Sequence, residues 1–431
     1  MALGRRSFLG TLGAGAALAP ALSIAASLGE PAAGARDAAD TLAGDEFGQL
    51  PRTLAEVRDA FAFTEKIIPL NAANLCPSPR LVAAAVSAYT RDIDQDCSFQ
   101  NRDKFQQTLE ATREKVAALL GVSGDTVALV RNTSEANNVI NNGIDLAAGD
   151  EVVLWAENHP TNYVAWRVRA ARFDFRVKVV QLPAAPGDIQ QLLDPFINAF
   201  TQRTRVLAVS QVSNVSGLAL PLAELVTVAH ARGIHVHVDG AQTWGIVAQD
   251  LNELGVDSYT ASAHKWFMGP KEVGLLYVHP SAIQRIWPGV VASGWGTSLK
   301  GDNVGARRFE SLGQRDDAAL AALGIAAQMH AQLGPSAIQA RARQLATRLK
   351  EGLLEAGARL VTPLDAQFSA GVCVTRVDPS NRGELFDRLY REHGIAGAPT
   401  GGLRLCPHIY NTDEHIDRAI AAVAALSHLL A

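Results

Sequence analysis

Short runs rich in apolar residues alternate along the chain with longer segments whose apolar residues recur at helical spacing. The short runs occupy residues 126–130, 151–155, 206–209 and 234–238. Runs of this length, bounded by turn residues, are typical of strands buried on both faces of a parallel sheet. Helical spacing covers residues 54–63, 104–120 and 221–232, among others. The alternation predicts an α/β fold with a mainly parallel, doubly wound sheet.

The pattern changes near residue 316, where a long alanine-rich helix over residues 317–333 is predicted. A smaller α+β domain follows, with helix 336–356, strand-like segments near 359 and at 371–376, helix 382–393, strand 403–405 and a final helix from 412. We therefore expect a signal peptide, an N-terminal tether and arm, a large domain, and a long helix with a small C-terminal domain. These parts span residues 1–35, 36–70, 71–315 and 316–431, respectively.

The start of the chain carries a pattern typical of export signals. Arg5 and Arg6 precede Ser7-Phe8-Leu9, and a run rich in glycine and alanine follows. The pattern resembles a twin-arginine signal peptide, with small residues suited to cleavage at Ala25 or Ala35. The apolar run is too short to span a bilayer. We therefore expect a periplasmic protein with no stable membrane span after processing.

Composition narrows the classes of partner. The formal net charge is −4 and the sequence has no basic tract, which argues against a nucleic-acid-binding protein. The four cysteines, Cys76, Cys97, Cys373 and Cys406, lie far apart. We therefore predict neither a metal site nor a disulfide scaffold, and one disulfide stays open if the protein is exported. No G-x-G-x-x-G follows an early strand, so a nicotinamide-binding domain lacks support.

Two reactive side chains lie at the ends of predicted strands. Asp239 ends the run at 234–238, and Lys265 directly follows a second strand-like segment that closes at residues 262–264. Ligands of open α/β sheets gather at the carboxyl ends of strands, so Asp239 and Lys265 are expected to share a site. An acid and a lysine suit a cofactor with a basic ring nitrogen and an aldehyde. Pyridoxal 5′-phosphate has both groups.

The motif D-G-A-Q at residues 239–242, followed by S-A-H-K at 262–265, resembles the class V aminotransferase family of fold-type I pyridoxal phosphate enzymes. That family includes cysteine desulfurases, kynureninases and isopenicillin N epimerases. The resemblance extends from about residue 70 to the end of the chain. It implies a homodimer, because fold-type I enzymes generally complete each site with residues of a second subunit.

A helix predicted to begin after residue 132 supplies a candidate anion site, since its first N–H groups and its dipole favour negative charge. In register with the Asp–Lys pair, it resembles the family's phosphate-binding turn, and we assign Thr133 and Ser134 to the cofactor phosphate. The resemblance adds Ser262 and His264 from the central motif. It also adds Thr297, from a glycine-rich loop that the partner subunit contributes in the family.

The resemblance also assigns the groups around the cofactor ring. Asp239 keeps the ring nitrogen protonated, and His159 stacks on the ring face. Gln242 donates to the phenolic oxygen, and Asn214 lies near that oxygen or the substrate. Lys265 forms the Schiff base and then carries protons at the substrate α-carbon, a role that needs a lowered lysine pKa.

Two residues are assigned to the substrate. Residues 402–412 resemble the family's R-x-S-P-H-x-Y-N-T ending, in which Arg404 clamps the substrate carboxylate through its planar fork. The loop at 71–79 resembles the family's entry segment near the active site, and Asn74 is taken from it as a substrate contact. No residue is assigned to a metal.

Departures from the family pattern guide the choice of reaction. Desulfurases need a nucleophilic cysteine on a mobile loop ahead of the clamp, and residues 396–402 contain none. An exported member is expected to modify an amino acid, or an amino-acid residue within a secreted natural product or peptide. Exported relatives that tailor siderophore peptides are a similar case. The sequence therefore indicates an exported enzyme acting at an α-carbon, by epimerisation or by oxidative tailoring.

Other functions stay open at this point. A class V aminotransferase that passes an amino group to a keto acid is the first alternative. A cysteine desulfurase or C–S lyase comes second. A non-catalytic binding module comes last, because Lys265, Asp239 and Arg404 are all present. A sugar-modifying aminotransferase would lack the carboxylate clamp, and Arg404 argues against it.

Overall fold

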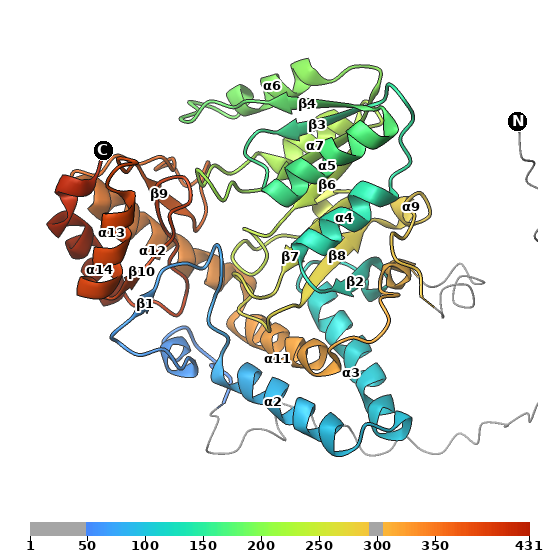
Figure 1. Ribbon diagram of the computed structural model, residues 1–431, viewed down its shortest axis with the longest axis horizontal. Helices are drawn as coiled ribbons and strands as arrows, with labels where there is room; N and C mark the ends of the chain where they lie inside the picture. Colours follow the sequence, from blue (N-terminus) through green and yellow to red (C-terminus); the bar gives the residue numbers. More distant parts are fainter. Residues whose placement is uncertain (1–48, 293–304) are drawn as a thin grey trace, which may run out of the picture. The chain divides into compact units, whose positions relative to one another are not determined.

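A seven-stranded sheet lies at the centre of the fold, in strand order β2-β8-β7-β6-β5-β3-β4 (Figure 1). The computed structural model describes residues 49–292 and 305–431. The strands are β2 (Val127–Val130), β3 (Glu151–Trp155), β4 (Arg176–Val180), β5 (Thr204–Ser210), β6 (His235–Asp239), β7 (Ser258–Ser262) and β8 (Gly274–Val278). Within this sheet β8 alone runs antiparallel to its neighbours, β7 and β2. The predicted mainly parallel sheet is confirmed.

Alternate residues of each strand explain why helices cover both faces of the sheet. In β3, Val152 and Leu154 pack with Trp166 of one core cluster, whereas Val153 and Trp155 belong to the largest core cluster. Successive strand side chains point to opposite faces, so an all-apolar strand needs cover on both. Helices α4 (Thr133–Gly143) and α5 (Pro160–Phe173) supply one layer. The largest cluster takes in residues of α2 (Arg80–Gln95), α3 (Phe99–Ala118), α6 (Gln190–Ala199), α7 (Leu222–His230), α8 (Leu251–Leu254) and α11 (Asp317–Leu333).

A second core lies among the C-terminal elements. These are α12 (Pro335–Glu355), β9 (Cys373–Thr375), α13 (Arg382–His393), β10 (Ile395–Ala396), β11 (Leu403–Leu405) and α14 (Asp413–Ala425). Strand β1 (Ile68–Pro69) pairs in parallel with β10, and Ile68 and Leu70 are buried in this second core. The segment before residue 70 therefore joins the C-terminal elements through its last residues. The helix predicted over 317–333 is confirmed residue for residue as α11.

One predicted helix is wrong. Residues 54–63 form only a 3₁₀ turn, η1 (Val57–Ala60), after which Phe61 is extended. Both Val57 and Phe61 are buried, and the Phe61 ring lies 5.1 Å from the Tyr410 ring. The apolar spacing of this segment therefore reflects two anchoring side chains rather than a continuous helical face, because contact with Tyr410 favours an extended chain at that point.

The remaining short elements complete the described chain. They are α9 (Pro280–Ile283) and the 3₁₀ turns η2 (Gly124–Thr126), η3 (Gly305–Phe309) and η4 (Ser427–Leu429). Among residues 49–292 and 305–431, none of the helices combines the length and apolarity needed to cross a bilayer. The twin-arginine segment and Thr297 lie outside these described residues.

A buried ion pair ties α3 to the segment that follows η3. Glu310 accepts hydrogen bonds from Arg113, whose side chain is 1% exposed, and from the backbone N–H of Leu129. Replacing Glu310 by alanine is expected to lower the free energy of unfolding by about 3 kcal/mol, as for other broken buried pairs. Glu110, 3.0 Å from Arg113, keeps the loss at the low end of that range. Urea denaturation of the two proteins measures the difference.

The matched control is an ion pair on the surface of α13. Glu392 bonds Arg388 at 2.9 Å, but the two side chains are 49% and 34% exposed. Replacing Glu392 by alanine is expected to leave the free energy of unfolding almost unchanged, because water screens exposed pairs. Equal losses of unfolding free energy in the two variants would show that burial is not the reason why the Glu310 pair stabilises the fold.

Candidate functional site

The predicted acid and lysine lie at the same edge of the sheet. Strands β6 and β7 are parallel neighbours, with Asp239 in register with Thr260. Asp239 is the last residue of β6, and Ser262 is the last residue of β7, three residues before Lys265. The sequence prediction that Asp239 and Lys265 come from adjacent strand ends therefore agrees with the structure.

The Asp239 carboxylate is buried and held by two donors. Asp239 is only 3% exposed. Oδ1 accepts a hydrogen bond from the Ala241 N–H at 3.0 Å, and Oδ2 accepts one from Asn137 Nδ2 at 3.0 Å. The carboxylate is thus fixed in orientation at the carboxyl edge of the sheet, where a ligand with a hydrogen-bond donor can meet it.

Lys265 carries the amine of the site. Burial lowers its pKa, the negative charge of Asp239 raises it again in part, and the positive charge of Arg404 lowers it further. Among the described residues, no protein group forms a hydrogen bond or ion pair with Lys265 Nζ. A lysine with a lowered pKa holds more of its neutral amine near pH 7, which is the nucleophilic form.

His159 lies at the start of α5. Its Nδ1 is 2.9 Å from Thr161 Oγ1 and accepts from the Thr161 N–H at 3.4 Å, so the ring hydrogen resides on Nε2. Burial is the main cause that lowers the His159 pKa, Asp239 opposes it, and Lys265 and Arg404 add to it. The half-buried ring is therefore neutral, and it lies close enough to Asp239, Lys265 and Arg404 for their charges to affect its pKa.

The residues of the predicted anion site lie where α4 meets the end of β7. Thr133 is the first residue of α4, and its backbone N–H donates to Ser262 Oγ at 2.8 Å. The Thr133 and Ser262 hydroxyls lie 2.7 Å apart, and Ser134 is next on the helix. His264 is half-buried, and burial followed by the charges of Lys265 and Lys271 lowers its pKa to about 4. His264 is therefore a neutral side chain near pH 7.

Arg404 reaches this region from the C-terminal part of the fold. It lies in β11, is 4% exposed, and donates through Nη1 to the Asn214 carbonyl at 2.9 Å. Nη2 lies 3.4 Å from Asn71 Oδ1, and the buried Nε has no hydrogen-bond partner among the described residues. An unpaired buried guanidinium N–H is costly, so it points to an acceptor that completes the site, such as a carboxylate.

Three other predicted residues are placed less directly. Gln242 is buried and gives one amide hydrogen to the Ala73 carbonyl at 3.0 Å, which leaves its second amide hydrogen for a ligand. Asn214 is half-buried and meets Arg404 through its carbonyl. Asn74 is exposed, and its backbone N–H bonds to Asn71. Their assigned roles stay predictions.

Sequence reasoning missed two buried polar residues beside Asp239. Asn137, on α4, donates to the Asp239 carboxylate, and His237, on β6, lies 3.0 Å from Asn137 Oδ1. A signal for His237 was available, because residues 237 and 239 of one strand share a face. Asn137 gave no such signal, since it meets Asp239 only through the packing of α4 on the sheet.

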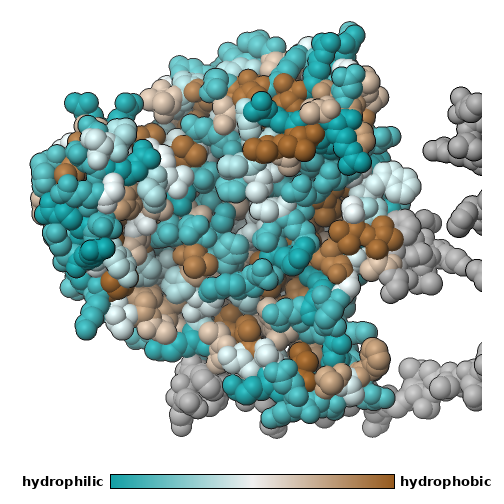
Figure 2. Space-filling view, viewed as in Figure 1, coloured by the Kyte–Doolittle hydropathy of each residue, from teal (hydrophilic) through white to brown (hydrophobic). Residues whose placement is uncertain are grey.

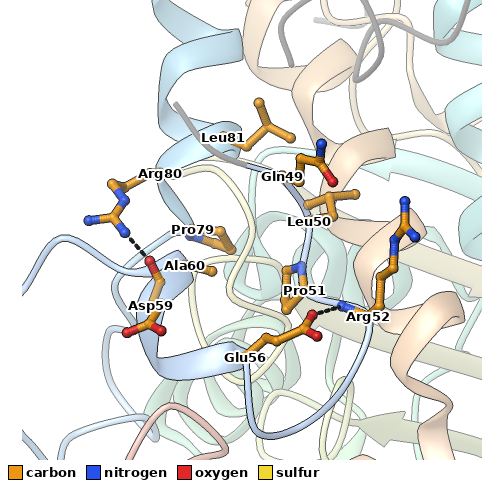
Figure 3. A pocket seen from close by; sticks show the side chains of 10 residues that line it. All are labelled: Gln49, Leu50, Pro51, Arg52, Glu56, Asp59, Ala60, Pro79, Arg80 and Leu81. Carbon is orange, nitrogen blue, oxygen red and sulfur yellow. Dashed lines mark hydrogen bonds between the residues drawn. The ribbon is translucent and has the colours of Figure 1, made fainter. Parts of the chain in front are cut away.

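The side chains present fit pyridoxal 5′-phosphate. A buried carboxylate suits a protonated ring nitrogen, an unpaired lysine suits the aldehyde, and two hydroxyls at a helix N-terminus suit the phosphate. A separate hollow of about 470 Å³ lies between residues 49–60 and 79–81 (Figure 3). None of the predicted site residues lines that hollow.

Comparisons with known proteins agree with this geometry. The family described as aminotransferase class-V matches residues 75–418. The chain is 30% identical to an isopenicillin N epimerase from Streptomyces clavuligerus, covering 86% of this chain and 98% of that protein. It is 32% identical to a cysteine desulfurase from Klebsiella pneumoniae, covering 75% and 83%, respectively.

Solved structures show the same fold. The cysteine desulfurase CsdA from Escherichia coli superposes with a TM-score of 0.76 at 25% identity, covering 88% of this chain and 99% of that chain. A C-DES mutant with glycine covalently linked to its PLP cofactor gives a TM-score of 0.77 at 24% identity, covering 85% and 98%. The predicted fold-type I architecture is confirmed.

Proposed function

The chain belongs to the class V aminotransferase family and is a pyridoxal 5′-phosphate-dependent enzyme, and from this premise we propose that it acts at the α-carbon of an amino acid. The amino acid is either free or part of a secreted natural product or peptide. The reaction is epimerisation or oxidative tailoring. The single observation that carries this proposal is the buried Arg404 beside Lys265 and Asp239, with a guanidinium N–H left unpaired by the described residues.

Each group of the chain then has a task at the substrate. When bound, the cofactor supplies an aldehyde that reacts with amines and a ring that withdraws electrons from the α-carbon. Asp239 would hold the ring nitrogen, Thr133 with Ser262 would hold the phosphate, and Lys265 would hold the aldehyde carbon through its amine. At the substrate, Lys265 would remove or return the proton at the α-carbon. His159 would cover the ring face and exclude water from it.

The burial of the cysteines and the similarity to an epimerase both favour chemistry at the α-carbon over desulfuration. A desulfurase needs an accessible thiolate, but Cys76, Cys373 and Cys406 are all buried, and burial raises their thiol pKa. The exposed Cys97 lies between α2 and α3 and not in the segment that precedes Arg404. The isopenicillin N epimerase relative, matched over 98% of its length, favours chemistry at the α-carbon.

The proposal is tested by following products from a panel of amino acids and short peptides in D₂O. Epimerisation exchanges the α-hydrogen for deuterium and yields both enantiomers, without a keto acid. Oxidative tailoring consumes oxygen. A stoichiometric keto acid with no oxygen uptake would replace this proposal by the aminotransferase alternative. Sulfide or persulfide release from cysteine would replace it by the desulfurase alternative.

Substitution of Arg404 by lysine tests the carboxylate clamp. Lysine keeps the positive charge but loses the bidentate fork, so KM for an amino acid is expected to rise about 10–100-fold, a loss of roughly 1.4–2.8 kcal/mol. The holoenzyme's cofactor content should not change. KM measurements on purified holoenzyme give the result.

The control for Arg404 uses the substrate instead of the protein. An amine that lacks the carboxylate has nothing for the clamp to bind, so the wild-type protein and the lysine variant should handle it equally. An equal loss for amine and amino acid would mean that Arg404 supports the fold of the site and does not bind a carboxylate.

Export and dimerisation belong to the same proposal. We propose a periplasmic homodimer, supported by the Arg5-Arg6 motif and by the exposed apolar residues Trp287, Val290 and Val291. The face in Figure 2 is mainly hydrophilic, with separate hydrophobic patches.

Replacing both Arg5 and Arg6 by lysine is expected to retain the protein in the cytoplasm on cell fractionation. Light scattering of the purified protein should give twice the chain mass; a monomer would contradict the dimer.

A further inference from the structure

We propose that Asn137 and His237 are positioning residues that hold the Asp239 carboxylate in place for the ring nitrogen of the cofactor. The inference rests on the proposed role of Asp239. It adds a polar chain behind that carboxylate, formed by side chains of α4, β6 and β7. Neither residue belongs to the motifs by which the site was predicted.

The chain of contacts is buried and continuous. Asn137 Nδ2 lies 3.0 Å from Asp239 Oδ2, and Asn137 Oδ1 lies 3.0 Å from His237 Nε2. His237 Nδ1 lies 2.9 Å from Ser258 Oγ, and Thr260 Oγ1 lies 2.7 Å from Asn137 Oδ1. All five residues are at most 3% exposed. Water therefore does not compete for these hydrogen bonds.

The direction of every hydrogen bond follows from the carboxylate. An ionised carboxylate only accepts, so the Asn137 amide must turn its NH₂ group to Asp239 and its oxygen to His237. That oxygen also only accepts, so His237 carries its hydrogen on Nε2, and Thr260 donates its hydroxyl hydrogen. His237 Nδ1 is then an acceptor, and Ser258 donates to it. Each hydrogen bond thus points toward Asp239.

The ionisation of His237 agrees with this direction. Burial lowers the His237 pKa to about 3, so the ring is neutral at neutral pH and carries one hydrogen. A neutral histidine has one donor and one acceptor nitrogen, and the two neighbours use both. Hydrogen bonds in such a chain polarise one another, which strengthens the last one, from Asn137 to Asp239.

This arrangement does more than fill the core. A purely structural role would be met by apolar side chains of similar size, and buried polar networks are often replaceable in that way. Here the chain ends on one oxygen of the carboxylate that is proposed to hold the ring nitrogen of the cofactor. It leaves that carboxylate as an acceptor of fixed orientation. We therefore expect the protonation of the ring nitrogen to depend on Asn137 and His237.

The test measures that protonation directly. Holoenzyme is prepared with pyridoxal phosphate labelled with ¹⁵N in the ring, and the ¹⁵N chemical shift is recorded across pH. In the variant Asn137→Leu, Asp239 Oδ2 loses its donor, and His237 and Thr260 lose the acceptor that they share. The Asp239 carboxylate is then a stronger base and is less well oriented, so the ring nitrogen is expected to move toward the unprotonated shift at neutral pH. Retention of the protonated shift would overturn the proposal.

Control variants separate position from charge. Asn142→Leu makes the same change on the exposed side of the same helix, α4, and should leave the ¹⁵N shift as in the wild type. His237→Leu removes the donor to Asn137, whereas His237→Gln retains an amide N–H that can replace Nε2. The leucine variant is expected to lower kcat about 10–100-fold, as removal of partners behind a metal ligand does, with KM little changed. The glutamine variant should recover most of this loss.

Two outcomes distinguish this inference from the proposed role of Asp239. If Asp239→Asn keeps the protonated ring nitrogen, the role of Asp239 itself is wrong. If Asp239→Asn loses it while Asn137→Leu and His237→Leu keep it, only the positioning role is wrong. The His237 pair also covers the case in which Asn137→Leu does not fold, since the glutamine and leucine variants at residue 237 then decide between the alternatives by their different shifts.

Discussion

The variant Lys265→Ala is expected to lose the borohydride-reducible link to pyridoxal phosphate and to lose activity by about 10³-fold or more. Lys265 supplies both the amine that reacts with the aldehyde and the base at the α-carbon, and a positioned acid–base group alone contributes about 10²–10⁴-fold. Burial lowers the lysine pKa in the native protein. Its removal relieves that cost, so the apoprotein should remain folded. Mass spectrometry after borohydride treatment measures the link.

The control for Lys265 is another lysine with a lowered pKa in the same region of the sequence. Lys271 donates to Ser78 Oγ at 3.0 Å, and burial lowers its pKa as well. The variant Lys271→Ala should keep the reducible link on Lys265. A covalent label of equal yield in Lys265→Ala would show that another amine holds the cofactor, and the assignment would then be abandoned.

The variant Asp239→Ala is expected to keep the cofactor on Lys265 but to lose turnover by about 10²–10³-fold, the usual effect of removing one preorganised electrostatic contact. The carboxylate is the group that the structure places at the strand end, between the Ala241 N–H and Asn137. Both donors lose their acceptor in the variant, which costs about 1–3 kcal/mol of stability. Borohydride labelling and initial rates on the same sample separate binding from chemistry.

A second buried aspartate provides the matched control. Asp257 is 8% exposed, accepts from the Val236 N–H at 2.7 Å and from His230 at 2.9 Å, and precedes β7 at the opposite edge of the sheet. Asp257→Ala loses hydrogen bonds of the same kind, so its stability should fall similarly while turnover stays within about twofold. Full turnover by Asp239→Ala would contradict the role of this carboxylate.

The residues predicted for the site are of two kinds: those at strand ends or a helix start, and Arg404, which comes from the C-terminal part of the chain. Asp239, Ser262 and Lys265 follow strand ends, and any parallel sheet brings neighbouring strand ends to one edge. Thr133 begins a helix whose N-terminus meets Ser262, as the anion-site pattern required. These positions needed only local periodicity and the order of elements. The charge effect of Arg404 on Lys265 joins residues far apart in the chain. The family ending predicted only that Arg404 binds the substrate carboxylate.

Long-range packing accounts for what the pattern did not predict. Strand β8 is inserted antiparallel between β2 and β7, and β1 pairs with β10 across more than three hundred residues. The apolar spacing of 54–63 predicted a helix, but contact with Tyr410 holds Phe61 extended. Periodicity reports which face of a segment is buried, and it does not report what that face will meet.

The sequence by itself determined the alternation of strands and helices, and it predicted that Asp239, Lys265 and the helix that begins at Thr133 lie at one edge of the sheet. These follow from spacings of two and about 3.6 residues and from turn chemistry, which act over a few residues. Only the tertiary structure decided that Asn137 faces Asp239 and that His237 stands behind it. Such contacts arise where helices pack on a sheet, and the free energy that selects them belongs to the assembled core.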